Sequence, residues 1–156
     1  MFAVESYFDD RGSMSLLFET DRLDGVSCDI IKISQGKKGV LRGFHMQNIP
    51  SEQSKWVFVL EGTIQDVCLE IGVDGRPTGR TKNYKLRWQR SGKDKALYVP
   101  SNWAHGYLVL SDFARVLYVC DGKYGNEVSY NPLKWYQGWE MDSATLIMSQ
   151  KDRDGL

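Results

Sequence analysis

The chain has 156 residues, in which 20 lysines and arginines are balanced by 20 aspartates and glutamates, giving a formal net charge of +0. This length fits a single domain over residues 1–156 that is large enough to bury a hydrophobic core. A balanced charge provides no overall field that attracts nucleic acid or an anionic membrane. We therefore expect neither as a partner, and expect any anion site to be a local cluster of cations.

The cysteines and the hydropathy pattern bear on the cellular compartment. Cys28, Cys68 and Cys120 are widely spaced and form no CxxC pair, which fits free and mostly buried thiols in a reducing compartment. No apolar run approaches the roughly 18 residues of a membrane span, and the N-terminal residues lack the apolar segment of a signal peptide. The expected location is the cytoplasm.

Short runs of β-forming residues separated by turn residues dominate the chain. Residues 42–55 are predicted as a strand, a turn and the start of a second strand. This second strand continues over residues 56–60 to Glu61–Gly62, where we expect a hairpin turn. Residues 63–71 form the next expected strand, and the glycines and the proline of residues 72–79 predict a loop. The remaining expected strands are 81–88, 96–99, 106–110 and 114–120.

The last part of the chain has a weaker pattern. Residues 121–132 are predicted as a loop with one extended piece, and residues 133–149 as a short helix or turn. Short strands at the spacing found here predict an all-β sandwich or barrel.

The most informative segment for function is Arg42-Gly43-Phe44-His45-Met46-Gln47, followed eight residues later by Lys55. Arginine offers a permanent cationic fork for phosphate, and histidine acts as a base near neutral pH. A lysine ammonium stabilises an oxyanion as it forms. These groups suit a phosphorylated ligand that must lose a proton. The alternative interpretation is a basic strand end with one packed histidine.

Separate pieces of the chain, in order, carry the motifs of one family. The chain resembles the dTDP-4-dehydrorhamnose 3,5-epimerases, the RmlC-type cupins. The resemblance implies an all-β cupin jelly-roll barrel with a short C-terminal helix or turn, usually a homodimer, that binds a nucleotide-linked 4-keto sugar inside. The matching pieces are 8–12 (FDDRG), 40–47 (VLRGFHMQ), 53–55 (QSK), 62–67 (GTIQDV), 99–107 (VPSNWAHGY), Leu117–Tyr118 with Tyr124 and Glu127, and 148–152 (MSQKD).

The resemblance also implies roles for four residues. A ketone at C4 of a hexose makes the hydrogens on C3 and C5 acidic, so epimerisation needs a base, a stabilised enolate and an acid on the opposite face. The family pattern assigns the base to His45 and its carboxylate partner to Asp152, which would fix the imidazole tautomer. Tyr118 falls where the family has its general acid, and Lys55 would stabilise the enolate oxygen.

Further side chains look like contacts to the diphosphate or the sugar, namely Arg42, Gln47, His105, Arg11 and Tyr124. For Arg11 the competing role is a turn arginine in an Asp-Arg-Gly loop. For His105 it is a structural pair with Asp66 on a neighbouring strand, which would not exclude contact with a ligand.

Two segments depart from the family pattern. Residues 13–16 replace the usual aromatics and glutamate, and residues 30–34 replace a strand that contains glutamine or asparagine. Both help to shape the sugar and nucleotide pocket in the family. The nucleotide is expected to be dTDP, but another nucleotide, another deoxysugar, or epimerisation at only one carbon stay open.

Three other functions compete with the predicted one. A metal-dependent cupin needs several histidines, whereas only His45 and His105 are present, so we expect no metal and no cofactor. A sugar-nucleotide 3,4-ketoisomerase usually has a second histidine where Gln47 stands. A non-catalytic sugar-nucleotide-binding cupin would not need a base and an acid on opposite faces. The sequence therefore favours a cofactor-independent epimerase of a nucleotide-linked 4-keto-6-deoxy sugar, acting at C3, C5 or both in deoxysugar biosynthesis.

Overall fold

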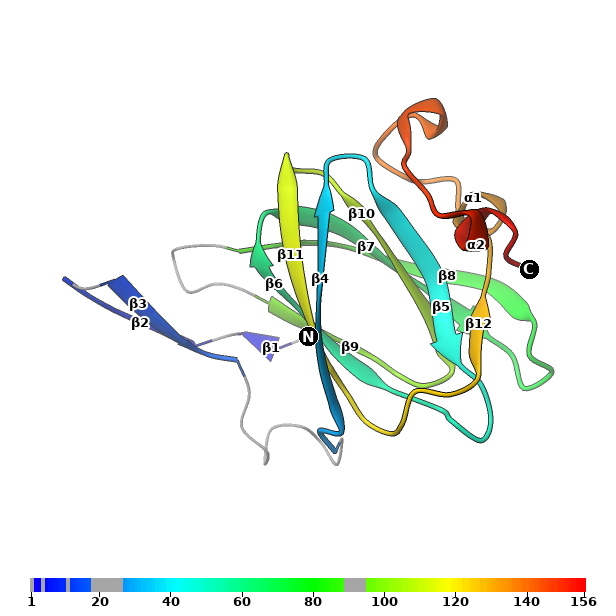
Figure 1. Cartoon of the computed structure of the whole chain (residues 1–156), viewed down its shortest axis with the longest axis horizontal. Helices are drawn as coiled ribbons and strands as arrows, with labels where there is room; N and C mark the ends of the chain where they lie inside the picture. The colour runs from blue at the N-terminus through cyan, green and yellow to red at the C-terminus, as the bar shows by residue number, and fades with distance from the viewer. Residues whose placement is uncertain (1, 4, 11, 18–26, 89–94) are drawn as a thin grey trace.

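The computed structural model describes residues 2–3, 5–10, 12–17, 27–88 and 95–156 (Figure 1). These residues form strands followed by short helical turns. The strands are β1 (Phe2–Ala3), β2 (Glu5–Asp9), β3 (Gly12–Leu16), β4 (Ile30–Lys37), β5 (Leu41–Gln47), β6 (Lys55–Glu61), β7 (Thr63–Ile71), β8 (Pro77–Arg87), β9 (Lys95–Val99), β10 (Trp103–Val109), β11 (Phe113–Cys120) and β12 (Glu127–Ser129). The helical turns are α1 (Pro132–Trp135), η2 (Ser143–Thr145) and α2 (Gln150–Arg153).

Two five-stranded sheets make up the barrel. The first has the strand order β1-β9-β6-β11-β4 and the second the order β12-β5-β10-β7-β8. Each pair of neighbouring strands is antiparallel, and β2 and β3 pair separately as a ribbon that projects away from the barrel (Figure 1). The predicted all-β barrel with short helical turns near the C-terminal end is confirmed.

The predicted strands appear with shifted boundaries. The strand expected at 81–88 begins at Pro77, and the one expected at 106–110 begins at Trp103. Pro77 can begin β8 because the first residue of a strand need not donate a hydrogen bond to the neighbouring strand. The extended piece expected within 121–132 is β12.

The predicted hairpin at Glu61–Gly62 is wrong. Strand β6 ends at Glu61 and β7 begins at Thr63, yet the two strands belong to different sheets. Gly62 has a φ of 82°, and a Cβ there would lie 2.1 Å from the carbonyl oxygen of Phe113. This glycine therefore carries the chain across the barrel from one sheet to the other, which alternating hydrophobicity alone does not reveal.

Replacing Gly62 with alanine is expected to destabilise the barrel by about 3 kcal/mol, because left-handed backbone strain adds to a clash with backbone atoms. Gly75 is the matched control, since its φ is 75° but nothing lies within 4 Å of an added Cβ. Gly75→Ala should cost only about 1 kcal/mol. Urea unfolding of both variants measures the difference, and equal losses would contradict the crossing role of Gly62.

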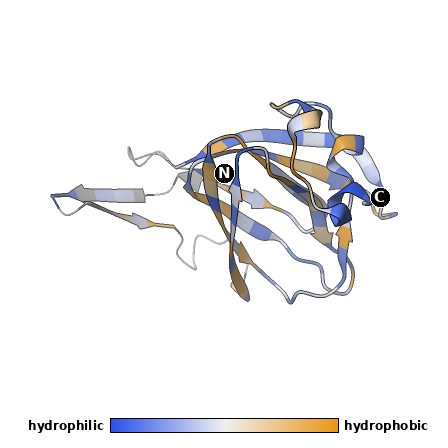
Figure 2. Ribbon diagram, turned by 45° about the horizontal axis from the view of Figure 1, so that its top comes forward, coloured by the Kyte–Doolittle hydropathy of each residue, from blue (hydrophilic) through white to orange (hydrophobic). Residues whose placement is uncertain are grey.

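Hydrophobic residues form one cluster between the sheets and further clusters outside them. The inner cluster draws on both sheets, including Val57 and Val116 from the first and Ile64 and Tyr107 from the second. Figure 2 shows apolar segments along the strands of the barrel. Burial between two sheets is the main stabilising contribution in such a fold.

The polypeptide after β12 covers the outer face of the second sheet. Phe44 and Leu69 pack there with Trp139, and the Gln65 side chain donates to the Gly138 carbonyl at 2.8 Å and accepts from the Glu140 N–H at 2.8 Å. Strand β7 is consequently buried on both faces. This explains why its hydrophobic residues alternate imperfectly.

The cysteines are free, with Cys28 exposed and Cys68 and Cys120 buried, in agreement with the expectation of mostly buried thiols. None of the helices within the described residues has the length and apolar character needed to cross a membrane.

Candidate active site

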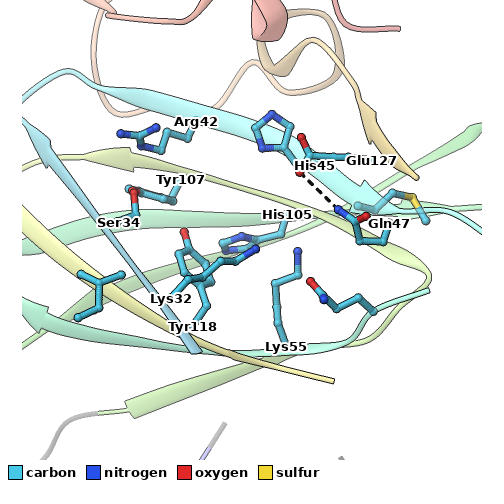
Figure 3. Close-up of a pocket in the computed structure, with 13 residues that line it drawn as sticks. Lys32, Ser34, Arg42, His45, Gln47, Lys55, His105, Tyr107, Tyr118 and Glu127 are labelled. Carbon is cyan, nitrogen blue, oxygen red and sulfur yellow. Dashed lines mark hydrogen bonds between the residues drawn. The ribbon is translucent and has the colours of Figure 1, made fainter. Parts of the chain in front are cut away.

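A cavity of about 180 Å³ opens inside the barrel between the two sheets (Figure 3). Six of the residues predicted from the sequence line it: Arg42, His45, Gln47, Lys55, His105 and Tyr118. Arg42, His45 and Gln47 come from β5 and His105 from β10, both in the second sheet, whereas Lys55 on β6 and Tyr118 on β11 come from the first. The structure therefore brings together groups that are far apart in the sequence and places them on facing walls.

An irregularity in β5 sets the directions of Arg42 and His45. Between these residues β5 contains one more residue than its partner β10, because His45 lies opposite His105 and Arg42 opposite Tyr107. In a regular strand, residues three apart point to opposite faces. The extra residue forms a β-bulge, which turns Arg42 and His45 toward the same face of the sheet, so both side chains reach the cavity. Gly43 within it has a φ of 108°, and a Cβ there would lie 2.5 Å from the Gly106 Cα.

His45 forms a pair with Asp152 of α2. The Nε2 atom of His45 lies 2.6 Å from Oδ1 of Asp152. Burial alone would raise the pKa of Asp152, but the His45 hydrogen bond and charge, with the Ser149 and Gly43 contacts, bring it below the usual value. An ionised Asp152 accepts the Nε2 proton, which leaves Nδ1 of a neutral His45 as an acceptor. The predicted His45–Asp152 contact is present.

Lys55 is a buried lysine, with 7% of the residue exposed. Within the described part of the chain it has neither a hydrogen-bond partner nor an ion-pair partner. Burial lowers the pKa of Lys55, and the nearby charge of Lys32 lowers it further, against the opposing effect of Cys120. A buried charge without a counter-ion is costly, so it marks a place for an anion or a developing oxyanion.

Tyr118 faces the cavity from β11. Its ring meets the ring of His105 edge-on, with centroids 5.9 Å apart, and the ammonium of Lys32 lies 5.7 Å from its centroid. Burial raises the pKa of Tyr118 well above its usual value, and Tyr107 and Asp66 raise it further. The phenol is therefore fully protonated at neutral pH and available as a proton donor.

His105 and Asp66 form the pair that the sequence offered as an alternative role for this histidine. The Nε2 atom of His105 lies 2.7 Å from Oδ2 of Asp66, and both residues are buried. His105 nevertheless lines the cavity, so the structural pair leaves its ring available to a ligand.

Gln47 is buried, and both ends of its side-chain amide have a partner. Its Oε1 accepts from the Gly125 N–H at 3.0 Å, and its Nε2 lies 3.4 Å from Oε2 of Glu127. Burial raises the pKa of Glu127, but the hydrogen bond from Lys151 and the charge of His45 outweigh burial and lower it overall.

The other two predicted binding residues are Arg11 and Tyr124. Arg11 lies outside the described residues. Tyr124 is 60% exposed in the loop before β12 and does not line the cavity. Its hydroxyl interacts with Glu127, at the rim, so a contact with the ligand stays a prediction.

Sequence reasoning did not select Lys32, Ser34, Tyr107 or Glu127, which also line the cavity. Lys32 and Ser34 are two residues apart on β4, the spacing at which strand side chains share a face. The hydroxyls of Ser34 and Tyr107 lie 2.8 Å apart. Glu127 belonged to a recognised motif without an assigned role. Among the described residues, no group of three or more histidine, cysteine, aspartate or glutamate side chains is placed to hold a metal ion.

Comparison with known proteins assigns the family. The family model described as dTDP-4-dehydrorhamnose 3,5-epimerase matches residues 1–156. The chain belongs to the dTDP-4-dehydrorhamnose 3,5-epimerase family. The epimerase of Streptomyces griseus is 31% identical, over 96% of this chain and 77% of the relative. The Neisseria gonorrhoeae epimerase is 36% identical over 78% of this chain, which spans only 37% of that relative.

Solved structures of epimerases have the same fold. The dTDP-4-dehydrorhamnose 3,5-epimerase of Elizabethkingia anophelis has a TM-score of 0.83 and 29% identity, covering 98% of this chain and 87% of that one. RmlC from Legionella pneumophila, solved with dTDP-4-keto-L-rhamnose, has a TM-score of 0.85 and 26% identity, covering 98% and 84%. The predicted family, its cupin-type barrel and its class of enzyme, an isomerase, are confirmed.

Proposed function

We propose that this family member epimerises a dTDP-linked 4-keto-6-deoxy sugar at C3, C5 or both through an enolate, without a cofactor, in deoxysugar biosynthesis. One observation carries the proposal. The His45–Asp152 pair and the protonated Tyr118 come from facing sheets, and the unpaired ammonium of Lys55 shares their cavity. Binding alone would not require a base and an acid on opposite sides of the ligand.

The reaction follows from these positions. Nδ1 of His45 takes the proton from the carbon next to the ketone, and Asp152 stabilises the resulting imidazolium. The electron pair moves onto the C4 oxygen, where the Lys55 ammonium stabilises the enolate. Tyr118 then donates its hydroxyl proton to the same carbon from the opposite face, which inverts that carbon. Exchange with solvent returns the proton from His45 and restores the one lost by Tyr118.

The remaining cavity residues bind the substrate in this proposal. Arg42 offers a guanidinium at the mouth, where one Nη donates to the Gln35 carbonyl at 3.1 Å. It would bind the diphosphate, while Gln47 and His105 would contact the sugar or phosphate. Tyr124 would add a contact from the loop before β12, and the contact of Arg11 with the ligand stays a prediction.

The names of relatives support a dTDP-linked substrate and leave the number of inverted carbons to experiment. Besides the 3,5-epimerases, a dTDP-4-dehydrorhamnose 3-epimerase of Streptomyces niveus is 27% identical over 97% of this chain and 75% of the relative. Two similar proteins can therefore differ in whether one carbon or two are inverted.

We also propose that the protein is a homodimer. A two-stranded ribbon is only marginally stable alone, yet β2 and β3 project from the barrel with Tyr7 and Met14 exposed (Figure 1). The edge strand β4 exposes Ile31 and Ile33, each by more than half of its surface. A second copy would cover these side chains. Light scattering should give twice the chain mass, and a monomer at micromolar concentration would contradict the dimer.

Proton NMR in deuterated water tests the proposed reaction on dTDP-4-keto-6-deoxyglucose. Loss of both the C3 and C5 proton signals is expected for a 3,5-epimerase, and loss of one signal for a single-site epimerase. A product with the ketone moved to C3 would identify a 3,4-ketoisomerase instead. If the folded protein binds the sugar but exchanges neither proton, the catalytic proposal is wrong and a binding role takes its place.

A further inference from the structure

The carboxylate that pairs with His45 is carried by a very short helix. Asp152 lies on α2, which has four residues, far below the length at which a helix is stable by itself. Asp152 is nevertheless buried, and its carboxylate approaches His45 to 2.6 Å. Contacts outside α2 must therefore fix the position of this carboxylate.

Three consecutive residues of α2 are tied to the rest of the molecule. Lys151 forms an ion pair with Glu127 of β12. Asp152 bonds to His45. A further hydrogen bond from the Gly43 backbone to Asp152 helps to lower the pKa of this carboxyl group. The carbonyl oxygen of Arg153 accepts from Nδ2 of Asn131 at 2.7 Å. At the start of the helix, the Ser149 hydroxyl accepts from the Asp152 N–H at 3.1 Å.

Asn131 has two separable functions in this arrangement. Its Oδ1 atom caps α1 by accepting from the N–H groups of Leu133 and Lys134, at 2.9 and 3.3 Å. Its Nδ2 atom is the donor to Arg153 of α2. One side chain thus connects the two helical turns.

Backbone contacts fix the segment beyond α2. The N–H of Asn131 donates to Leu156 O at 3.1 Å, and the N–H of Leu156 donates to Ser129 O at 3.0 Å. Nε1 of Trp135 also donates to Leu156 O, at 2.7 Å. Gly155 fits against Asn131, where a Cβ would lie 2.7 Å from the backbone nitrogen. The segment from Lys151 to Leu156 is therefore bonded to the rest of the molecule along its length.

We propose that Asn131 is a positioning residue for the reaction: through its Nδ2–Arg153 hydrogen bond it holds α2 so that Asp152 meets His45. This inference rests on the proposed function for its kinetic consequence, whereas the contact itself is independent of it. A displacement of about 1 Å in a catalytic group is enough to cost up to ~100-fold in rate. Among the described residues, no hydrogen bond of the Asn131 side chain reaches a cavity residue, so its effect on the reaction would pass through Asp152.

Asn131→Asp separates the two functions. Aspartate is an equally good helix cap, so α1 keeps its acceptor, but a carboxylate cannot donate to Arg153 O. We expect hydrogen exchange of the sugar to slow by about 10-fold. Asp142→Ala is the matched control, because Asp142 caps η2 by accepting from the Ala144 N–H and does not touch α2. This control should retain the rate of the unmodified protein.

A double-mutant cycle tests whether the effect passes through Asp152. If it does, Asn131→Asp combined with Asp152→Asn should be no slower than Asp152→Asn alone. Multiplied effects would overturn the proposal. Trp135→Phe, which removes only the Nε1 donor to Leu156 O, provides a milder second variant should Asn131→Asp fold poorly. It should slow exchange in the same direction by a smaller factor.

NMR of the imidazole N–H protons gives a readout that does not require activity. The chain has two histidines, and each is bonded to a carboxylate. In Asn131→Asp the signal of His45 should broaden or disappear, while that of His105 persists as an internal reference. An unchanged His45 signal would overturn the positioning role. If the unmodified protein exchanges no sugar proton, the proposed function fails, but this measurement still decides the role of Asn131.

Discussion

Replacing His45 with glutamine is expected to abolish deuterium incorporation at the sugar, whereas replacing Tyr118 with phenylalanine should preserve incorporation and abolish inversion. The two residues come from facing sheets, so in the proposed reaction they act on opposite faces of the sugar. Without His45 no proton is removed. Without the Tyr118 hydroxyl the enolate still forms but regains its proton from the His45 side. General acid–base groups contribute about 10²- to 10⁴-fold, so both losses should be large.

The measurement follows exchange and configuration in the same sample. Proton NMR in deuterated water reports the loss of each carbon-bound proton, and coupling constants report the configuration of the product. Tyr98→Phe serves as the control for Tyr118→Phe, because Tyr98 packs against Trp56 with ring centroids 4.9 Å apart, in a cluster outside the cavity. If both active-site variants lose exchange and inversion to the same extent, the two-face mechanism is wrong.

The sequence predicted the strands and the reactive residues better than it predicted the connections between the strands. Short runs of apolar and β-branched residues located β6, β7 and β11, although these strands are too buried for a strict alternation of apolar and polar residues. The same pattern cannot say which sheet a strand joins, so the crossing at Gly62 was mistaken for a hairpin. Only the approach of Phe113 O to this glycine, from a distant part of the chain, distinguishes the two.

The residues of the candidate site also fall into two groups, those that the sequence predicted and those that only the structure shows. Family motifs indicated His45, Lys55, Tyr118 and Asp152, and three of these line the cavity while the fourth bonds to His45. Lys32 was missed because its strand lacks the family pattern, although its spacing from Ser34 was available. The anchoring of Asp152 by Asn131 was beyond prediction, since side chain–backbone bonds between loops leave no periodic signal. Motifs identify reactive groups, whereas the groups that hold them are seen only in the fold.

Replacing Lys55 with methionine is expected to stabilise the protein at pH 7 while slowing sugar exchange by about 100-fold or more. Burial lowers the pKa of Lys55 in the folded state, so the unfolded chain holds this proton more tightly. The charge therefore opposes folding, and this cost falls as the pH rises from the folded-state pKa of Lys55 to its unfolded value. A methionine of similar length fills the space without a charge. The gain in unfolding free energy should be about 1 kcal/mol.

The stabilisation produced by Lys55→Met should decrease as the pH rises. As the pH approaches the usual lysine value near 10.5, the unfolded chain also loses its proton, and the cost of burying the charge disappears. The advantage of Lys55→Met over the unmodified protein should therefore shrink between pH 7 and pH 10 in urea unfolding. Lys38→Met, exposed in the turn between β4 and β5, should show neither the stabilisation nor the pH dependence. A destabilised Lys55→Met at pH 7 would mean that the ammonium supports the barrel. A more stable but inactive variant would mean that the ammonium is retained for the enolate oxygen, at a cost to the fold.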